Sequence, residues 1–399
     1  MDRPLKIGIG VHGRFHAFGL AAGLLELGHD VTVFTNYPAF IAARFGIPAA
    51  RVRGFPLHGM AVRLAERLRL FEKVPGIDGL MHGWFGSWLA RRLTAERWDA
   101  TYTWSSVSKE YLERERVAGA RLVARGSTHI RKQWRLLHEE EVRTGCAIGK
   151  PSEDIMRREE AEYALADAII VLSSFSRQTF LEAGLPPEKV RLMVSAVHVA
   201  DFAATPEIVQ ARQQRLLSGA PLRVLNVGTF SHRKGALDLV AMADELPQDR
   251  FQFRFVGTVT DEARILAEKA RGRIEFIPRV PQSELQEHYA WADVFVLPSI
   301  EEGLAAVLPQ AAAAGLLVLA TPNSGAVDVM RDGGGGWILP ARDAAAFAQK
   351  LRWIASHRSE AADMLCQSDP MTDSRDWQDA AADFVQHCRQ VGSSHGRSA

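Results

Sequence analysis

The sequence is poor in cysteine and has no long hydrophobic run. Three cysteines occur in 399 residues, Cys146, Cys366 and Cys388, and no two of them form a CxxC pair. Isolated cysteines are typical of reduced thiols in a cytosolic protein. No apolar run approaches the roughly 20 residues that span a bilayer, and the N-terminus enters a strand pattern without the apolar core of a signal peptide. We therefore expect a cytoplasmic protein.

An excess of charge of one sign is also absent. The 48 Lys and Arg residues are balanced by 47 Asp and Glu residues, which gives a formal net charge of +1. This balance argues against a nucleic-acid-binding protein. The sequence contains no Asp-x-Asp, no His, Cys, Asp and Glu cluster with metal-ligand spacing, no G-x-S-x-G and no Walker loop. These absences argue against a metal site, the common hydrolases and the P-loop NTPases.

Short apolar runs alternate with helical patterns along the whole chain, whose length favours two domains. Such alternation predicts parallel sheets covered by helices. We predict a first domain at 1–205, a second at 206–375 and a C-terminal helix and tail at 376–399, with a polar linker near 204–220. The predicted strands are 5–10, 31–35, 99–104, 120–125 and 168–172 in the first domain, and 222–227, 251–256, 274–277, 294–297 and 317–320 in the second.

Three glycines follow the first predicted strand. Gly8, Gly10 and Gly13 match the G-x-G-x-x-G pattern of nucleotide-binding turns. An NAD-binding enzyme also needs an acid at the end of the second strand, but Asn36 follows that strand and Asp30 precedes it. The glycines therefore predict close approach of a ligand other than NAD.

The segment 298–315, PSIEEGLAAVLPQAAAAG, predicts a ligand-binding loop. It follows the buried strand at 294–297 and places Glu301 and Glu302 before a helix, with Pro309 expected at the first helical position. Ligands of open α/β sheets bind at the carboxyl ends of the strands, and a helix N-terminus suits a phosphate. A helix-capping loop with exposed acids is the alternative interpretation.

Two further turns carry candidate site residues. Arg233 and Lys234 follow the strand at 222–227 and its Gly228, and two adjacent cations there suit a diphosphate. His129 follows the strand at 120–125 and could face a cleft and hydrogen-bond a substrate hydroxyl, and His12, His16 and His198 are weaker candidates of the same kind. The alternatives are solvated surface cations and a histidine satisfied within its own loop.

These motifs together resemble glycosyltransferase family 4, retaining enzymes of the GT-B fold in which two Rossmann-like doubly wound domains face each other across a cleft. The family's E-x7-E motif begins here at Glu302, and Gln310 stands where its second glutamate is expected. Lys234-Gly235 matches the diphosphate-binding Lys-Gly, while Thr229 replaces the usual arginine and Arg233 could substitute for it. The resemblance covers nearly the whole chain, and it implies that the first domain binds the acceptor and the second binds the nucleotide sugar.

The resemblance implies roles for four catalytic residues. Glu302 would hold hydroxyls of the transferred sugar, and His129 would touch the same sugar. Lys234 and Arg233 would neutralise the diphosphate as it leaves, without a metal ion or any other cofactor. The C-terminal helix, near Trp377, would pack back on the first domain. The implied donor-binding residues are Gly10, Gly13, Gly228, Arg279, Gly303, Leu304, Ala305, Ala306 and Gln310.

The sequence thus predicts a metal-independent retaining glycosyltransferase that uses a nucleotide-diphosphate sugar. Alternatives are a non-catalytic nucleotide-sugar-binding protein, or a nucleotide-sugar epimerase or phosphorylase on the same fold. The acceptor could be a glycan, a lipid-linked sugar or a small molecule. Basic residues of the first domain, Arg63, Arg67, Arg69 and Lys73, could rest on anionic lipid at the inner membrane face, or could simply belong to a solvated amphipathic helix.

Overall fold

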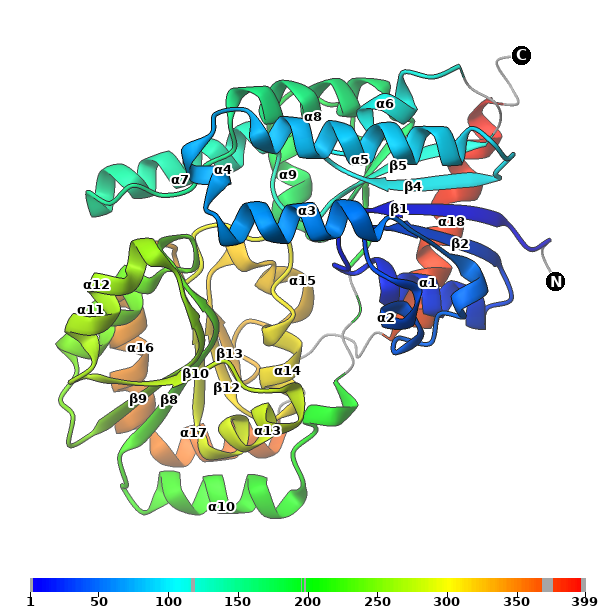
Figure 1. Ribbon diagram of the computed structural model, residues 1–399. Coiled ribbons are helices and arrows are strands. Elements are labelled where there is room, and N and C mark those ends of the chain that lie inside the picture. The colour runs from blue at the N-terminus through cyan, green and yellow to red at the C-terminus, as the bar shows by residue number, and fades with distance from the viewer. Residues whose placement is uncertain (1–2, 116–118, 195, 197–198, 368–375, 396–399) are drawn as a thin grey trace.

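The computed structural model describes residues 3–115, 119–194, 196, 199–367 and 376–395. Within them, two all-parallel sheets follow each other along the chain, each covered by helices (Figure 1). The strands of the first sheet are β1 (Lys6–Val11), β2 (Asp30–Thr35), β3 (Val52–Gly54), β4 (Ala100–Trp104), β5 (Ala120–Arg125), β6 (Ala168–Val171) and β7 (Val190–Leu192). Those of the second are β8 (Leu222–Phe230), β9 (Phe251–Val259), β10 (Ile274–Pro278), β11 (Val294–Leu297), β12 (Leu317–Ala320) and β13 (Gly336–Ile338).

The strand order identifies both units as Rossmann-like. The first sheet runs β3-β2-β1-β4-β5-β6-β7 and the second β10-β9-β8-β11-β12-β13. In each, the chain starts in the middle of the sheet and winds outward to both edges, so the predicted doubly wound architecture is confirmed. The ten predicted strands are all present, whereas β3, β7 and β13 were not predicted, because three residues are too few to show a period.

Helices connect the strands. Those of the first domain are α1 (Ala17–Glu26), α2 (Ala39–Ala43), α3 (Pro56–Arg67), α4 (Leu70–Lys73), α5 (Ile77–Leu93), α6 (Lys109–Leu112), α7 (Ile130–Thr144), α8 (Glu153–Leu165) and α9 (Ser174–Glu182). The rest are α10 (Pro206–Leu217), α11 (Ala236–Glu245), α12 (Arg264–Ala270), α13 (Gln282–Trp291), α14 (Val307–Ala313), α15 (Ala326–Val329), α16 (Ala344–Ser356), α17 (Arg358–Gln367) and α18 (Trp377–His395). Short 3-10 turns are η1 (Ala49–Arg51), η2 (Ala200–Phe202), η3 (His232–Lys234), η4 (Asp261–Ala263) and η5 (Pro322–Ser324).

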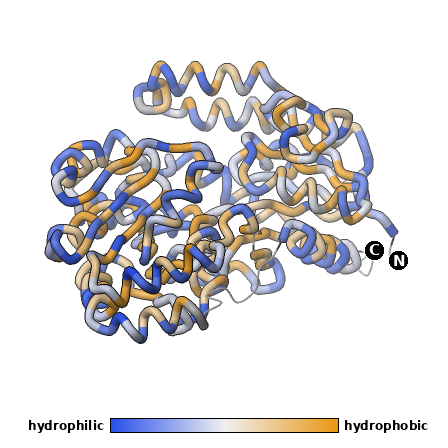
Figure 2. Tube along the Cα trace, turned by 90° about the horizontal axis from the view of Figure 1, so that it is seen from below, coloured by the Kyte–Doolittle hydropathy of each residue, from blue (hydrophilic) through white to orange (hydrophobic). Residues whose placement is uncertain are grey.

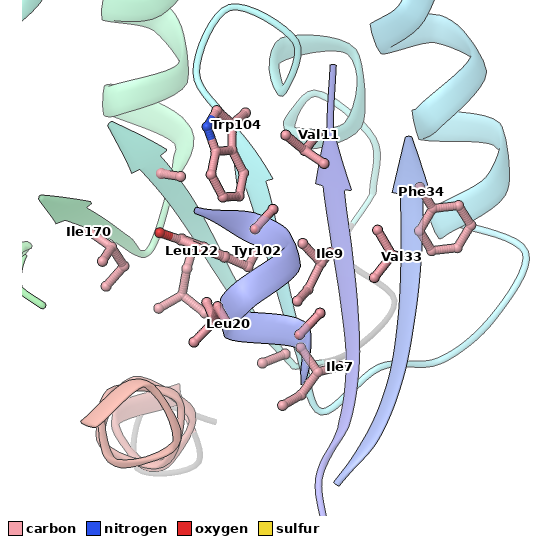
Figure 3. Close-up of a cluster of buried hydrophobic side chains, with 14 of the residues drawn as sticks. Ile7, Ile9, Val11, Leu20, Val33, Phe34, Tyr102, Trp104, Leu122 and Ile170 are labelled. Carbon is pink, nitrogen blue, oxygen red and sulfur yellow. The ribbon is translucent and has the colours of Figure 1, made fainter. Parts of the chain in front are cut away.

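Each sheet is the centre of a hydrophobic core. In the first domain Ile7, Ile9 and Val11 of β1 are fully buried and pack with side chains of β2, β4 and α1 (Figure 3). Hydrophobic and hydrophilic residues alternate along the surrounding helices, which present one face to a sheet (Figure 2). No helix in the described ranges is long and apolar enough to cross a membrane.

The C-terminal helix α18 belongs spatially to the first domain. It lies against α1 (Figure 1), and its Ala381 and Phe384 are buried in the first core. The approach depends on Gly19 and Gly23 of α1, because a Cβ atom at either would lie 2.2 Å from an atom of Trp377. The chain therefore returns from the second domain to close the first.

The segment 204–220 is a structured helix, so the prediction of a linker there was wrong. Arg212 of α10 is fully buried in the second domain. Its guanidinium donates hydrogen bonds to the carbonyl oxygens of Ala292, Ala314, Gly315 and Tyr289, at 2.7–3.1 Å. A polar sequence pattern does not reveal that one of its arginines is buried and donates hydrogen bonds to four backbone carbonyl groups.

Candidate functional site

A cavity of about 970 Å³ lies between the domains, at the carboxyl ends of both sheets. Loops after parallel strands meet at this edge, as expected for a ligand site in α/β proteins. The first domain contributes residues 14–16 after β1, Trp104 at the end of β4 and Gly126 after β5. The second contributes Leu304, Ala306 and Gln310 after β11, together with Gln282, Ser283 and Gln286 of α13.

Glu301 joins the two domains beside this cavity. Its carboxylate is fully buried and accepts hydrogen bonds from the Thr128 backbone N–H at 3.0 Å, from Thr128 Oγ1 at 2.6 Å and from the Ser127 hydroxyl. Arg233 Nε donates to the same carboxylate at 2.8 Å. Burial alone raises the pKa of Glu301, but Arg233 and the hydroxyl donors outweigh it and hold the pKa at about 2. The sequence analysis assigned a role to Glu302 and none to Glu301, so it did not predict this contact between the domains.

Glu302 and Lys234 form an ion pair in the second domain. Glu302 is only 8% exposed, and Ser299 Oγ lies 3.5 Å from its carboxylate. Burial and the neighbouring charge of Arg233 lower the pKa of Lys234 to about 7, while Glu301 acts in the opposite direction. The structure therefore brings together Glu302, Lys234 and Arg233, three of the four predicted catalytic residues.

The loop after Glu302 is pressed against the first domain. A Cβ atom at Gly303 would lie 2.1 Å from the carbonyl oxygen of Gly126. Only glycine allows the two backbones to approach so closely. Gly303 therefore serves as a contact between the domains, in addition to any donor contact predicted for it.

Two details of this loop differ from the prediction. The backbone N–H of Ala305 donates to the carbonyl of Ser324 at 3.0 Å, so it is not available to a phosphate as expected. The helix begins at Val307, which makes Pro309 its third residue rather than its first. The cavity is lined here by Leu304 and Ala306. Proline is tolerated anywhere in the first turn of a helix. The start of the helix was therefore predicted two residues too late.

Gln310, in the place of the second motif glutamate, lines the cavity. Tyr289 donates its hydroxyl hydrogen to Gln310 Oε1 at 3.1 Å. This bond fixes the amide and leaves its NH2 group oriented as a donor. A carboxylate could accept from Tyr289 in the same way but could not donate.

The predicted glycines have different surroundings. A Cβ atom at Gly10 would lie 2.6 Å from the Leu89 side chain, so Gly10 allows close packing against α5, and it is not among the cavity-lining residues. Gly13 has a φ of +137°, and its carbonyl accepts from Thr35 Oγ1 at 2.9 Å. Gly228 has a φ of +142° with open space above it. Arg279, after β10, is exposed and is not among the cavity-lining residues.

His129 does not face the cavity, contrary to expectation. It is the N-cap of α7, and its Nδ1 accepts a hydrogen bond from the Arg131 N–H at 3.3 Å. The ring is buried against Tyr163 and Phe180, and this burial lowers its pKa to about 4. The interpretation of a histidine satisfied within its own loop describes it better. The weaker candidate His198 lies outside the described residues.

Some cavity residues of the first domain were not predicted from the sequence. Arg14 and Phe15 follow the glycine motif directly and line the cavity, together with His16, which the sequence analysis had given as a weaker candidate. These residues could have been predicted from their position at the carboxyl end of the first strand, because the G-x-G-x-x-G motif itself indicates only its glycines. Among the described residues, no three His, Cys, Asp or Glu side chains are placed to hold a metal ion.

Comparison with known proteins finds a family match in the second domain. Residues 221–357 match the family model described as Glycosyl transferases group 1. The match covers most of the second domain and about a third of the chain. The putative colanic acid biosynthesis glycosyltransferase WcaL of Salmonella typhimurium is 27% identical over 46% of this chain and 47% of its own length. The chain thus spans about half the length of the curated relatives it matches.

The likeness to solved structures extends over both domains. Sucrose-phosphate synthase from Thermosynechococcus elongatus superposes with a TM-score of 0.68 over 98% of this chain and 100% of that one, at 19% identity. Alr3699/HepE of Anabaena, in complex with UDP-glucose, gives 0.62 over 98% and 99%, at 15% identity. At these identities the likeness establishes the fold, which is GT-B as expected.

Proposed function

We propose that this chain is a retaining, metal-independent glycosyltransferase that transfers a sugar from a nucleotide-diphosphate sugar to an acceptor hydroxyl. The observation that carries the proposal is the group of Arg233, Lys234 and Glu302, held together at the carboxyl edge of a group 1 glycosyl transferase domain. Alr3699/HepE, which has the same fold, binds UDP-glucose, and this supports a nucleotide sugar as the donor.

The donor would change the partners of the cations. Lys234 pairs with Glu302 and Arg233 with Glu301, so each cation is balanced by a carboxylate. An arriving diphosphate would take over Lys234, which frees the Glu302 carboxylate to accept hydrogen bonds from sugar hydroxyls. Lys234 and Arg233 would then stabilise the negative charge that grows on the leaving diphosphate. Gln310 would hydrogen-bond the ribose.

In the transfer, the bond between the sugar anomeric carbon and the phosphate oxygen breaks, and its electron pair stays on the phosphate. The acceptor oxygen forms the new bond on the same face, and its proton passes to the leaving phosphate oxygen. Retention follows from the resemblance to glycosyltransferase family 4. Charge stabilisation and acceptor positioning supply the catalysis, so no covalent nucleophile is required.

The test is a donor panel without metal. UDP-, GDP- and ADP-sugars are added in the presence of EDTA, and melting temperature and slow donor hydrolysis are measured. We expect one donor to stabilise the protein and to be hydrolysed, and we expect Lys234→Ala to lower turnover roughly 10²- to 10³-fold. Glu302→Ala should also lose turnover, whereas Lys269→Ala, an exposed lysine of α12, should not.

Two outcomes would contradict this function. Stabilisation by a donor without turnover, even after acceptor extracts are added, would indicate a non-catalytic nucleotide-sugar-binding protein. No response to any nucleotide sugar would remove the donor-binding proposal altogether.

We further propose that the protein works in the cytoplasm in contact with the inner membrane surface, on a lipid-linked or glycan acceptor. Support comes from α3, where Leu57, Met60 and Leu64 are 58%, 60% and 57% exposed and share one helix face, next to Arg63 and Arg67. Exposed apolar and basic side chains on one helix suit an anionic lipid surface.

Membrane contact is testable by co-sedimentation with vesicles containing 30% anionic phospholipid, a proportion of about one third chosen to give a negative surface potential. We expect wild type to pellet and Leu64→Ser to pellet several-fold less, since each buried apolar side chain contributes about 1–2 kcal/mol. Ile265→Ser removes an equally exposed apolar residue from α12 and is the matched control. Equal pelleting of both variants, or none of wild type, would refute the contact.

A further inference from the structure

The first-domain end of the cavity combines exposed aromatic rings with two arginines. We propose that this end is the acceptor subsite and that the acceptor is a sugar carrying a negative charge, either a carboxylate or a phosphate. The proposal rests on the glycosyltransferase function above, because it names the second substrate of that reaction. It is carried by the conformation of Phe15, by the arrangement of Arg14 and Arg44, and by the charge balance of the cavity wall.

Phe15 has an unusual backbone and an unusual exposure. Its φ is +39°, a left-handed conformation that is unfavourable for a bulky residue. Its side chain is 61% exposed although it lines the cavity, and it stacks on Trp104 with ring centroids 6.2 Å apart and planes 18° from parallel. Folding gains little from an exposed ring on a strained backbone. Strained residues of this kind cluster at ligand sites, and an aromatic face suits a sugar ring.

The two arginines are held at the same end of the cavity. The Arg14 guanidinium lies 4.7 Å from the centroid of the Phe45 ring, which restricts its motion. Arg44, beside Phe45 at the end of α2, also lines the cavity. Within the described part of the chain, neither guanidinium forms a salt bridge with a carboxylate, and both are exposed. Their hydrogen-bond donors are therefore available to a ligand.

The charge of the cavity wall points in the same direction. The charged residues that line it are Arg14, Arg44 and Asp201, and Asp201 comes from the second-domain side. A carboxylate or phosphate can accept two parallel hydrogen bonds from a guanidinium group and gains from its charge, whereas a neutral hydroxyl accepts a single, weaker bond. The donor diphosphate has its own cations in Arg233 and Lys234.

The experiment compares three sugars as probes by ligand-observed NMR titration at low salt: glucose, glucuronate and glucose 6-phosphate. We expect at least one charged sugar to bind about tenfold or more tightly than glucose, and the preferred one identifies a carboxylate or a phosphate. The double variant Arg14→Gln, Arg44→Gln should abolish that preference. Arg92→Gln, an exposed arginine of α5 outside the cavity, should keep it. Phe15→Gly should weaken the binding of all three sugars by a similar factor.

Binding of UDP to the same variants separates the two substrates. If the arginine variant weakens UDP binding as much as it weakens the charged sugars, the arginines serve the donor and the proposal is overturned. Equal affinity for all three sugars, or no binding of any of them, also overturns it. A wild-type protein that responds to nucleotide sugars but not to charged sugars disproves the subsite while leaving the proposed function intact.

Discussion

Charged residues of the two domains, in and beside the cavity, are used in opposite ways. On the second-domain side, Arg233 and Lys234 are each paired with a buried glutamate, and one of these glutamates also binds the first domain. On the first-domain side, Arg14 and Arg44 have no carboxylate partner among the described residues. Paired charges fix the position of a loop and of a domain, whereas unpaired ones can take a ligand directly. The paired charges beside the cavity thus stabilise the structure, whereas the unpaired charges that line the cavity are open to a ligand.

The largest predicted effect follows from this division. Glu301→Ala removes a buried carboxylate and leaves Arg233 and the hydroxyls of Ser127 and Thr128 without their partner. We expect a loss of about 3 kcal/mol in the free energy of unfolding, measured with urea. Arg44→Gln should change the same free energy by no more than about 0.5 kcal/mol. A comparable loss of unfolding free energy in the two variants would contradict the contrast between paired and unpaired charges.

The second prediction concerns pH. Burial and Arg233 lower the pKa of Lys234 to about 7, so the free protein loses this charge as the pH rises through 7. A diphosphate binds the charged form, and the diphosphate of a nucleotide sugar keeps a constant charge over this range. Affinity for the donor should therefore fall about fivefold between pH 7 and pH 8, measured by calorimetry.

Lys234→Arg provides the matched variant for this dependence. Arginine remains charged throughout the range, so the variant should bind with an affinity that is nearly independent of pH. An unchanged pH dependence in Lys234→Arg would mean that another group titrates.

The smallest predicted effect concerns Phe15, in the first-domain part of the cavity. Phe15→Gly replaces a strained, exposed residue with one that adopts a φ of +39° freely. We expect the melting temperature to stay the same or to rise slightly, by the equivalent of up to about 1 kcal/mol. A clear loss of stability would show that the Phe15 ring stabilises the fold rather than serving a ligand.

The sequence predicted the sheets well and the side-chain contacts poorly. Strands such as β11 are short, apolar and bounded by turns, so their local pattern is sufficient to find them. The pairing of Glu301 with Ser127 and Thr128 spans more than 170 positions and leaves no local signal. His129 was misjudged because its direction depends on packing against Tyr163 and Phe180. Position along a strand is encoded locally, but the direction of a side chain is not.

The two domains approach closely at the contact between Gly303 and Gly126 because Gly303 has no side chain. Any larger residue at 303 would act as a wedge, because its Cβ atom would overlap the Gly126 carbonyl oxygen. We expect Gly303→Ala to push the two loops apart while leaving each sheet intact, and so to loosen the contact between the domains at this backbone crossing.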